Sequence, residues 1–291
     1  MIPRISVAAA SLLLSMVVVQ PAAADEAGLK MSKSSIRAGA SDIGVTMFEP
    51  VGGARKPPIV VLHGAGGMVF DGPEMRRVSR HLAAEGHPVY MLHYFNSTGT
   101  VVALDSAMQK HFGTWRRTVI DAVAEIQRLR GDATPVGIYG YSLGAFLALF
   151  SASENPRVGA VVEHAGGIWN GKLDRVGKMP PVLMVHGEQD ARVPFEKYAE
   201  PLVPELRRRS PKVETRFFPS EAHVFTPAAM QSVRGHAARF FDRWLSRRSR
   251  NQVDVLVIPA GVKHRFENRG STAAVTFNVY SPPEYPANEK G

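Results

Sequence analysis

The stretch VGIYGYSLGAFLALFSAS, residues 136–153, joins a short apolar run to an apolar helical pattern through the pentapeptide GYSLG at residues 140–144. A serine between glycines at a strand-to-helix turn is typical of a nucleophile elbow, in which a strained backbone exposes the hydroxyl. The glycines are needed for a steric reason, because only residues without a side chain leave room for the strand and the helix to pass close to the serine. We therefore interpret Ser142 as a nucleophile rather than as an ordinary helix N-cap.

The chain on both sides of this turn alternates between short apolar runs and amphipathic stretches. Runs rich in Val, Ile and Leu predict strands covered on both faces, at residues 59–62, 88–93, 136–139, 158–163, 182–186 and 213–218. Apolar side chains at three- and four-residue steps predict helices at residues 74–85, 115–130, 142–153, 195–208 and 227–246. The alternation indicates an α/β fold with a mostly parallel sheet flanked by helices. Residues 165–180 leave no room for a large lid domain, so we expect an open site.

A serine hydroxyl needs a base to take its proton, and the base needs an acid to orient it. After an elbow of this kind the acid comes next along the chain and the histidine last. The carboxylates that follow Ser142 near apolar runs are Asp190, Glu188 and the more remote Asp174. The candidate base is His223, which follows the strand predicted at 213–218 and precedes the last helix.

Other histidines compete with His223 for the role of base. His186 and His164 end or follow predicted buried strands, and we interpret both as satisfied structural histidines. His236 falls in the middle of a predicted helix. His223 is therefore the predicted base.

An anionic intermediate formed at Ser142 must be met by fixed N–H donors. The residue after the nucleophile, Leu143, supplies one donor, and we expect Ala65 in the glycine-rich run HGAGG, residues 63–67, to supply the other. This run lacks the Lys-Ser/Thr ending of a P-loop and the glycine spacing of a dinucleotide-binding loop. His63 is interpreted as a packing residue.

Four motifs together, HG at 63–64, GYSLG at 140–144, HGEQD at 186–190 and AH at 222–223, resemble the dienelactone hydrolase family of the α/β-hydrolases over residues 34–246. The resemblance implies an α/β-hydrolase fold and selects Asp190 as the acid, because the sequence ARVP that follows it is familiar from that family. It implies hydrolysis of a carboxylic ester or lactone, a small-molecule substrate, through an acyl-enzyme. A serine peptidase of the oligopeptidase type and a non-catalytic binding protein are the alternatives.

Two departures from that family concern the substrate. Dienelactone hydrolases proper have a cysteine where this chain has Ser142, and an arginine that holds the substrate carboxylate where this chain has Pro227. These differences favour a broader carboxylesterase or acyl-hydrolase activity over dienelactone hydrolysis itself.

The first 24 residues read as a signal peptide. Arg4 precedes an apolar run at 5–19, and Ala22, Ala23 and Ala24 form a small-residue cleavage site. The apolar run is short for a membrane span, so we expect a mature chain that begins near Asp25, is periplasmic or secreted, and keeps no stable membrane span. The chain has no cysteine, which excludes a thiol nucleophile and a thiolate metal site.

The character of the sequence changes near Asn251, which predicts a signal peptide at 1–24, a hydrolase domain at 25–250 and a β segment at 251–291. The β segment contains P-x-G-x-x-H-x-x-x-N at 259–268 and resembles the second conserved motif of cupins. The first cupin motif is absent and His264 alone cannot hold a metal, so we predict no metal and no cofactor. So short a segment cannot close a barrel, and we expect it to pack on the hydrolase domain or to pair in a homodimer.

The formal net charge is +9. Part of it lies in arginines at 207–209 and at 247, 248 and 250, where predicted helices end and positive charge complements the helix dipole. No nucleic-acid-binding motif accompanies these arginines, so we expect no nucleic-acid partner.

Overall fold

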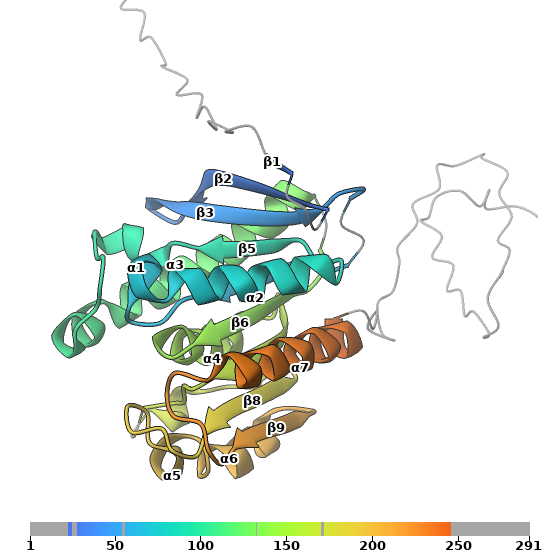
Figure 1. Ribbon diagram of the computed structural model, residues 1–291. Coiled ribbons are helices and arrows are strands. Elements are labelled where there is room, and N and C mark those ends of the chain that lie inside the picture. Colours follow the sequence, from blue (N-terminus) through green and yellow to red (C-terminus); the bar gives the residue numbers. More distant parts are fainter. Residues whose placement is uncertain (1–22, 25–27, 54–55, 132, 170–171, 246–291) are drawn as a thin grey trace, which may run out of the picture. The chain divides into compact units, whose positions relative to one another are not determined.

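The computed structural model describes residues 23–24, 28–53, 56–131, 133–169 and 172–245; the remainder is drawn in grey in Figure 1. By its contacts the chain divides into two units, Met1–Arg248 and Ser249–Gly291. The predicted β segment, with its cupin-like motif and His264, lies outside the described residues, as does most of the predicted leader. The predictions made for these two segments stay predictions.

One sheet organises the first unit. Its strands are β1 (Ala23–Ala24), β2 (Leu29–Ala38), β3 (Ser41–Pro50), β4 (Ile59–Leu62), β5 (Val89–Leu92), β6 (Val136–Tyr141), β7 (Val158–His164), β8 (Val182–Gly187) and β9 (Val213–Phe218). Their order in the sheet is β1-β2-β3-β5-β4-β6-β7-β8-β9. The pairs β1–β2, β2–β3 and β3–β5 are antiparallel. The remaining neighbours, from β5 through β4, β6, β7 and β8 to β9, are parallel. The expected mostly parallel sheet is confirmed.

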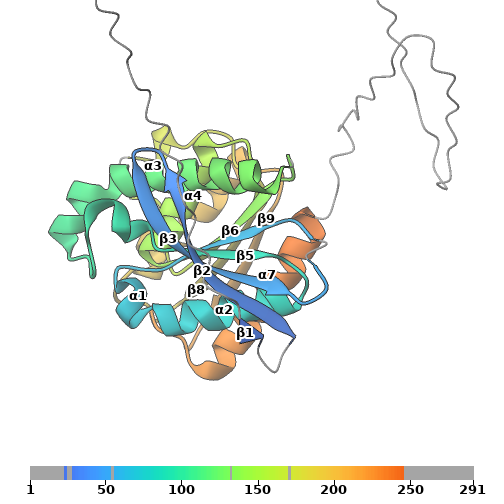
Figure 2. The same cartoon turned by 90° about the horizontal axis from the view of Figure 1, so that it is seen from above.

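Helices cover both faces of this sheet, as Figures 1 and 2 show. One core cluster joins the sheet to α2 (Gly72–Ala84) and α7 (Pro227–Leu245). The cluster on the opposite face joins it to α3 (Asp105–Arg130), α4 (Leu143–Glu154) and α6 (Leu202–Arg209). The short elements α1 (Gly67–Phe70), η1 (Tyr94–Thr98), η2 (Leu173–Arg175) and α5 (Phe195–Tyr198) lie in connections.

The sequence patterns missed the long hairpin of β2 and β3. Its two strands pair along their whole length, from Leu29 opposite Pro50 to Ala38 opposite Ser41. In β2 the apolar residues are few, and only Leu29, Ile36 and Ala38 are buried. A strand near the edge of a sheet can stay polar because much of it faces solvent, so it lacks the apolar run by which the central strands were found.

Two predicted helices differ in extent from the observed ones. The helix expected at 195–208 is divided into α5 and α6, with Pro201 at the N-cap of α6, because proline has no N–H with which to continue a helix. Helix α3 begins at Asp105, well before the predicted start at 115. Its first turns carry few buried side chains, so they show no apolar face in the sequence. In the part of the chain that the structure describes, no helix is long and apolar enough to cross a membrane.

Candidate active site

Ser142 lies in the turn between β6 and α4 with φ 52° and ψ −120°, a backbone conformation that non-glycine residues rarely adopt. The glycines on either side of it permit this turn. A Cβ on Gly140 would lie 2.3 Å from the carbonyl oxygen of Gly144, and one on Gly144 would lie 2.6 Å from the carbonyl oxygen of Leu62. Any side chain at these positions would therefore collide with backbone, which is the steric reason expected from the sequence.

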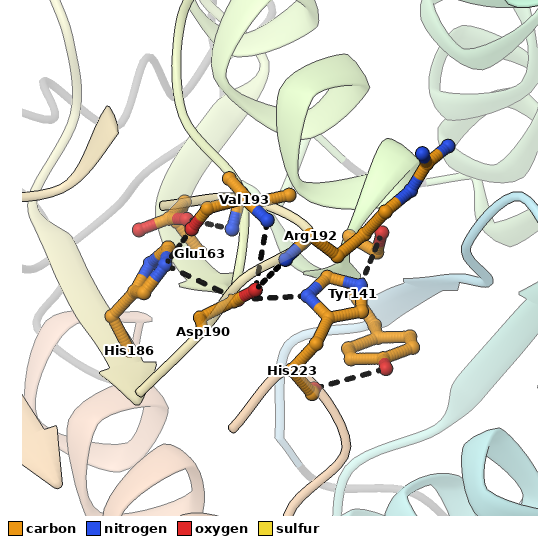
Figure 3. Close-up of polar contacts among 9 residues, drawn as sticks. Tyr141, Glu163, His186, Asp190, Arg192, Val193 and His223 are labelled. Atoms are coloured by element: carbon orange, nitrogen blue, oxygen red, sulfur yellow. Dashed lines mark hydrogen bonds and ion pairs between the residues drawn. The ribbon is translucent and has the colours of Figure 1, made fainter. Parts of the chain in front are cut away.

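The structure brings Ser142, His223 and Asp190 together, and Figure 3 shows His223 facing Asp190. Nε2 of His223 lies 2.9 Å from Oγ of Ser142, and Nδ1 of His223 lies 2.7 Å from Oδ2 of Asp190. Ser142 follows β6, Asp190 follows β8 and His223 follows β9. These strands are parallel, so their carboxyl ends share one edge of the sheet, where binding sites of open α/β sheets form.

The backbone after β8 holds the carboxylate of Asp190. Its Oδ1 accepts hydrogen bonds from the backbone N–H groups of Arg192 (2.9 Å) and Val193 (2.8 Å). Burial alone would raise the pKa of Asp190, but hydrogen bonds from His186 and His223 hold that pKa well below its ordinary value. Asp190 is therefore a carboxylate at neutral pH, as an acid that orients a histidine must be.

The competing carboxylates lie apart from this cluster. Glu188 is exposed, and its backbone N–H donates to the carbonyl oxygen of Phe218. Asp174 belongs to η2, in the connection between β7 and β8. Neither contacts His223, so the geometry agrees with the choice of Asp190 over both.

Two of the competing histidines depart from their predicted interpretation as fully satisfied residues. His186 and His164 are buried, but Nδ1 of His186 and Nε2 of His164 have no hydrogen-bond partner among the described residues. His186 moreover contacts Asp190, with Nε2 3.4 Å from Oδ2. The sequence could not show this contact, because it depends on how the loop after β8 folds back on its own strand.

The remaining histidines behave as expected. His236 lies in α7 beside Arg216 and Arg239. His63 is buried, donates from Nδ1 to the carbonyl oxygen of Gly64 and stacks on Tyr94. Burial lowers the pKa of His63 to about 4, so it is a neutral packing residue.

Ala65 and Leu143, the predicted oxyanion donors, line the same cavity as Ser142. This cavity has a volume of about 490 Å³, and Phe146, Trp169 and Tyr198 form much of its aromatic wall. The carbonyl oxygen of Ala65 accepts the N–H of Ala103 at 2.8 Å, which anchors the loop that carries Ala65.

A second cavity, of about 650 Å³, has Tyr141 and Phe225 among its lining residues. The hydroxyl of Tyr141 donates to the carbonyl oxygen of His223 at 3.1 Å and so fixes the loop that carries the histidine. The sequence did not indicate this role, although Tyr141 directly precedes Ser142. In the described part of the chain, no group of three or more His, Asp or Glu side chains could hold a metal ion.

Comparison with known proteins places this arrangement in a family. The model of the dienelactone hydrolase family matches residues 43–247. A putative dienelactone hydrolase from Klebsiella pneumoniae subsp. pneumoniae is 17% identical, with 74% of this chain and 99% of that chain covered and a TM-score of 0.62.

Two further solved structures have the same fold. A dienelactone hydrolase from Anabaena variabilis is 20% identical, covering 75% of this chain and 99% of its own, with a TM-score of 0.56. A dienelactone hydrolase-like promiscuous phosphotriesterase from metagenomic libraries is also 20% identical, with the same coverage and a TM-score of 0.60. No curated protein matches the chain. The family match covers more than half of the sequence, and the chain belongs to the dienelactone hydrolase family.

Proposed function

We propose that this chain is an exported serine hydrolase that cleaves carboxylic esters or lactones through an acyl-enzyme, with Ser142 as nucleophile, His223 as base and Asp190 as the orienting acid. The observation that carries the proposal is the continuous hydrogen-bonded series from Ser142 Oγ through His223 to Asp190, at 2.9 and 2.7 Å. Family membership supports the ester or lactone class of substrate.

In the first half of the reaction, His223 Nε2 takes the proton of Ser142 as Oγ forms a bond to the carbonyl carbon of the ester. The carbonyl oxygen becomes an oxyanion, which the backbone N–H groups of Ala65 and Leu143 stabilise. Asp190 stabilises the imidazolium that forms on His223. The intermediate then collapses, and the alcohol leaves with the proton that His223 returns to it.

In the second half, a water molecule gives a proton to His223 and attacks the acyl carbon, and the bond to Ser142 Oγ breaks. The acid is released and Oγ regains its proton from His223. A lactone follows the same path, except that the alcohol and the acyl group are parts of one molecule, so no alcohol leaves and hydrolysis of the acyl-enzyme releases a single hydroxy acid.

The cavity lined by Ser142 supports a small-molecule substrate. Its volume of about 490 Å³ lies in the range of ordinary ligand pockets, and its wall is rich in aromatic and aliphatic side chains. Export is supported by the leader-like sequence of residues 1–24. A homodimer formed through residues 251–291 is the assembly that we propose.

The test is a pre-steady-state measurement with a p-nitrophenyl ester. The wild-type chain is expected to release about one equivalent of p-nitrophenol in a burst before steady turnover, because p-nitrophenol is a good leaving group and acylation should be faster than hydrolysis of the acyl-enzyme. The Ser142→Ala variant should give neither the burst nor the turnover. Wild-type protein that hydrolyses no ester or lactone contradicts the proposal.

A further inference from the structure

Two buried titratable side chains behind Asp190 have no part in the mechanism above. Glu163 lies in β7 and His186 in β8, and both are fully buried. The strands are parallel neighbours in which Glu163 is level with Met184. Met184 and His186 share one face of β8, because successive side chains in a strand alternate between faces. Glu163 and His186 therefore lie on the same face of the sheet, the face covered by α4.

His186 links this pair to the acid. Its Nε2 lies 2.8 Å from the carbonyl oxygen of Val193 and 3.4 Å from Oδ2 of Asp190 (Figure 3). A carbonyl oxygen only accepts hydrogen bonds, so Nε2 carries a hydrogen. The other ring nitrogen, Nδ1, is buried and has no partner in the described part of the chain.

Glu163 links the pair to the elbow. Its Oε1 accepts the backbone N–H of Gly166 at 2.6 Å. A Cβ on Gly166 would lie 2.4 Å from Cβ of Ala145 and 3.2 Å from the carbonyl oxygen of Ser142, so this loop packs directly under the nucleophile. The second oxygen, Oε2, is buried and, like Nδ1 of His186, unpartnered among the described residues.

The charges explain why the pair should hold a proton. Glu163 and Asp190 are two carboxyl groups buried beside one imidazole, and a second buried negative charge is costly unless something neutralises it. A proton on Nδ1 of His186 or on Oε2 of Glu163 neutralises this second negative charge. The two atoms make no direct hydrogen bond with each other, so the imidazole and the carboxyl group interact through their charges.

The pKa shifts agree with this reasoning. Burial raises the pKa of Glu163 to about 7. Burial alone would lower the pKa of His186, but the hydrogen bond to Asp190 and the charge of Glu163 outweigh it and raise that pKa above its ordinary value. Both groups thus keep their protons to higher pH than they would in water.

We propose that Glu163 and His186 form a proton-holding pair that positions Asp190 and, through Asp190, adjusts how strongly His223 acts as a base. The inference rests on the proposed function in one respect, which is that Asp190 must orient the catalytic histidine. His186 and Glu163 are positioning residues, since neither contacts Ser142 Oγ.

The surroundings of the pair contain few other titratable groups. Asp190 and the backbone N–H of Arg192 come from the loop after β8, while the guanidinium of Arg192 pairs with Asp105. His164 comes from β7, and burial lowers its pKa to about 3, so it is neutral. His223 comes from the loop after β9. The residues of α4 buried on this face are apolar or hydroxyl-bearing.

Release of the proton held by the pair should appear as an additional ionisation in the pH dependence of the activity. When the pair releases its proton, a further negative charge appears behind Asp190, and the imidazolium of His223 becomes more stable. The pH dependence of kcat/KM should then contain an ionisation that comes from the pair.

The test compares variants that keep the hydrogen bonds but remove one of the two titrating groups. In Glu163→Gln the side-chain carbonyl can still accept the N–H of Gly166. In His186→Gln the side-chain amide can still donate to Val193. The control is His87→Gln: His87 is also buried and contacts a carboxylate, with Nε2 3.2 Å from Oδ1 of Asp242, but it precedes β5, at the opposite edge of the sheet from Ser142.

The measurement is kcat/KM for phenyl acetate between about pH 5 and 9. Glu163→Gln should lose the ionisation that comes from the pair, because the amide does not titrate and His186 loses the negative charge that raises its pKa. His186→Gln should move that ionisation to higher pH, because Glu163 stays buried without the imidazole that favours its charged form. His87→Gln should follow the wild-type profile. Profiles of Glu163→Gln and His186→Gln that superimpose on the wild type would overturn the proposal.

A second measurement needs no activity. In wild-type protein labelled with ¹⁵N-histidine, the ring signals of His186, assigned by their loss in His186→Gln, should titrate with a pKa above the ordinary value for histidine, and Glu163→Gln should move that titration to lower pH. Signals that do not titrate, or that Glu163→Gln leaves unchanged, contradict the pair. Wild-type protein without esterase activity would instead contradict the proposed function, and the labelled histidine would still report on the pair.

Discussion

Oδ2 of Asp190 lies 2.7 Å from Nδ1 of His223, while Oδ1 of the same carboxylate accepts two backbone N–H groups. The loop after Asp190 thus holds the carboxylate through Oδ1, and Oδ2 faces the imidazole of His223. A hydrogen on Nδ1 of His223 can bond to this carboxylate, and in that tautomer Nε2 is the acceptor that faces Ser142 Oγ, which is the arrangement that the proposed function requires.

Replacing Ser142 by alanine should lower kcat for ester hydrolysis by about a thousandfold or more, because the acyl-enzyme can no longer form. The protein should stay folded, which circular dichroism and thermal unfolding check. Ser153→Ala is the matched control, since Ser153 lies in α4 and its hydroxyl donates only to the carbonyl oxygen of Phe150. A Ser142→Ala variant that keeps more than about a tenth of the activity would show that Ser142 is not the nucleophile.

Replacing Asp190 by asparagine should reduce kcat less than the loss of Ser142 does, because the orienting acid is then lost alone. It should also change the pH dependence of stability. The pKa of Asp190 is lower in the folded state than its ordinary value of 3.8, so its charged form stabilises the fold above that pH, and this stabilisation is lost as the pH falls through the folded-state pKa.

Thermal unfolding of the wild type and of Asp190→Asn measures that effect. The wild type should have the higher Tm near neutral pH, and the difference should narrow in acid. A difference in Tm that is constant from neutral pH into acid would show that the charge of Asp190 does not stabilise the fold.

Replacing Gly144 by alanine should destabilise the fold by about 3 kcal/mol or more and abolish activity, since the added Cβ would meet the backbone of Leu62 and His63. Gly113→Ala is the control. Gly113 lies within α3 with nothing within 4 Å of an added Cβ, so alanine there should stabilise the protein by about 0.5–1 kcal/mol through its higher helix propensity. Urea unfolding of both variants measures the contrast, and equal effects would contradict the packing argument.

The absence of cysteine permits a chemical test of the nucleophile. A serine-directed organophosphonate should label the protein once, at Ser142, and stop turnover, while iodoacetamide at neutral pH should leave turnover unchanged. Labelling should be lost in Ser142→Ala and strongly reduced in His223→Ala, because the base that activates attack on an ester also activates attack on phosphorus. If mass spectrometry finds the adduct on another residue, that residue and not Ser142 is the nucleophile.

Truncation after Arg250 should change stability or assembly more than catalysis, because all the proposed catalytic residues precede it. Chelators should leave hydrolysis unchanged, since the tail lacks the first cupin motif that would complete a metal site around His264. Activity lost on chelation and restored by a divalent ion would show that a metal takes part. Light scattering of the full and truncated chains checks the assembly.

Much of the central fold could be predicted because local sequence patterns specify its strands and helices. The strand predicted at 59–62 is β4, and the strand, turn and helix around Ser142 follow from one continuous stretch of apolar residues and glycines. These elements are buried on both sides, so their composition alone distinguishes them. Strand β2 escaped prediction because its exposure leaves no such composition, whereas β3 has buried apolar residues that alternate with others instead of a continuous apolar run.

The sequence by itself determined that a serine stands in a strained turn after a buried strand, and that an acid and a histidine follow it in that order. Only the tertiary structure decided which side chains meet. Asp190 and His223 lie in contact because parallel strands end at a common edge, and Glu163 lies on the same face as His186 because of the register between β7 and β8. Local composition encodes each strand, but contacts between strands depend on how distant segments align, which no single stretch of the chain records.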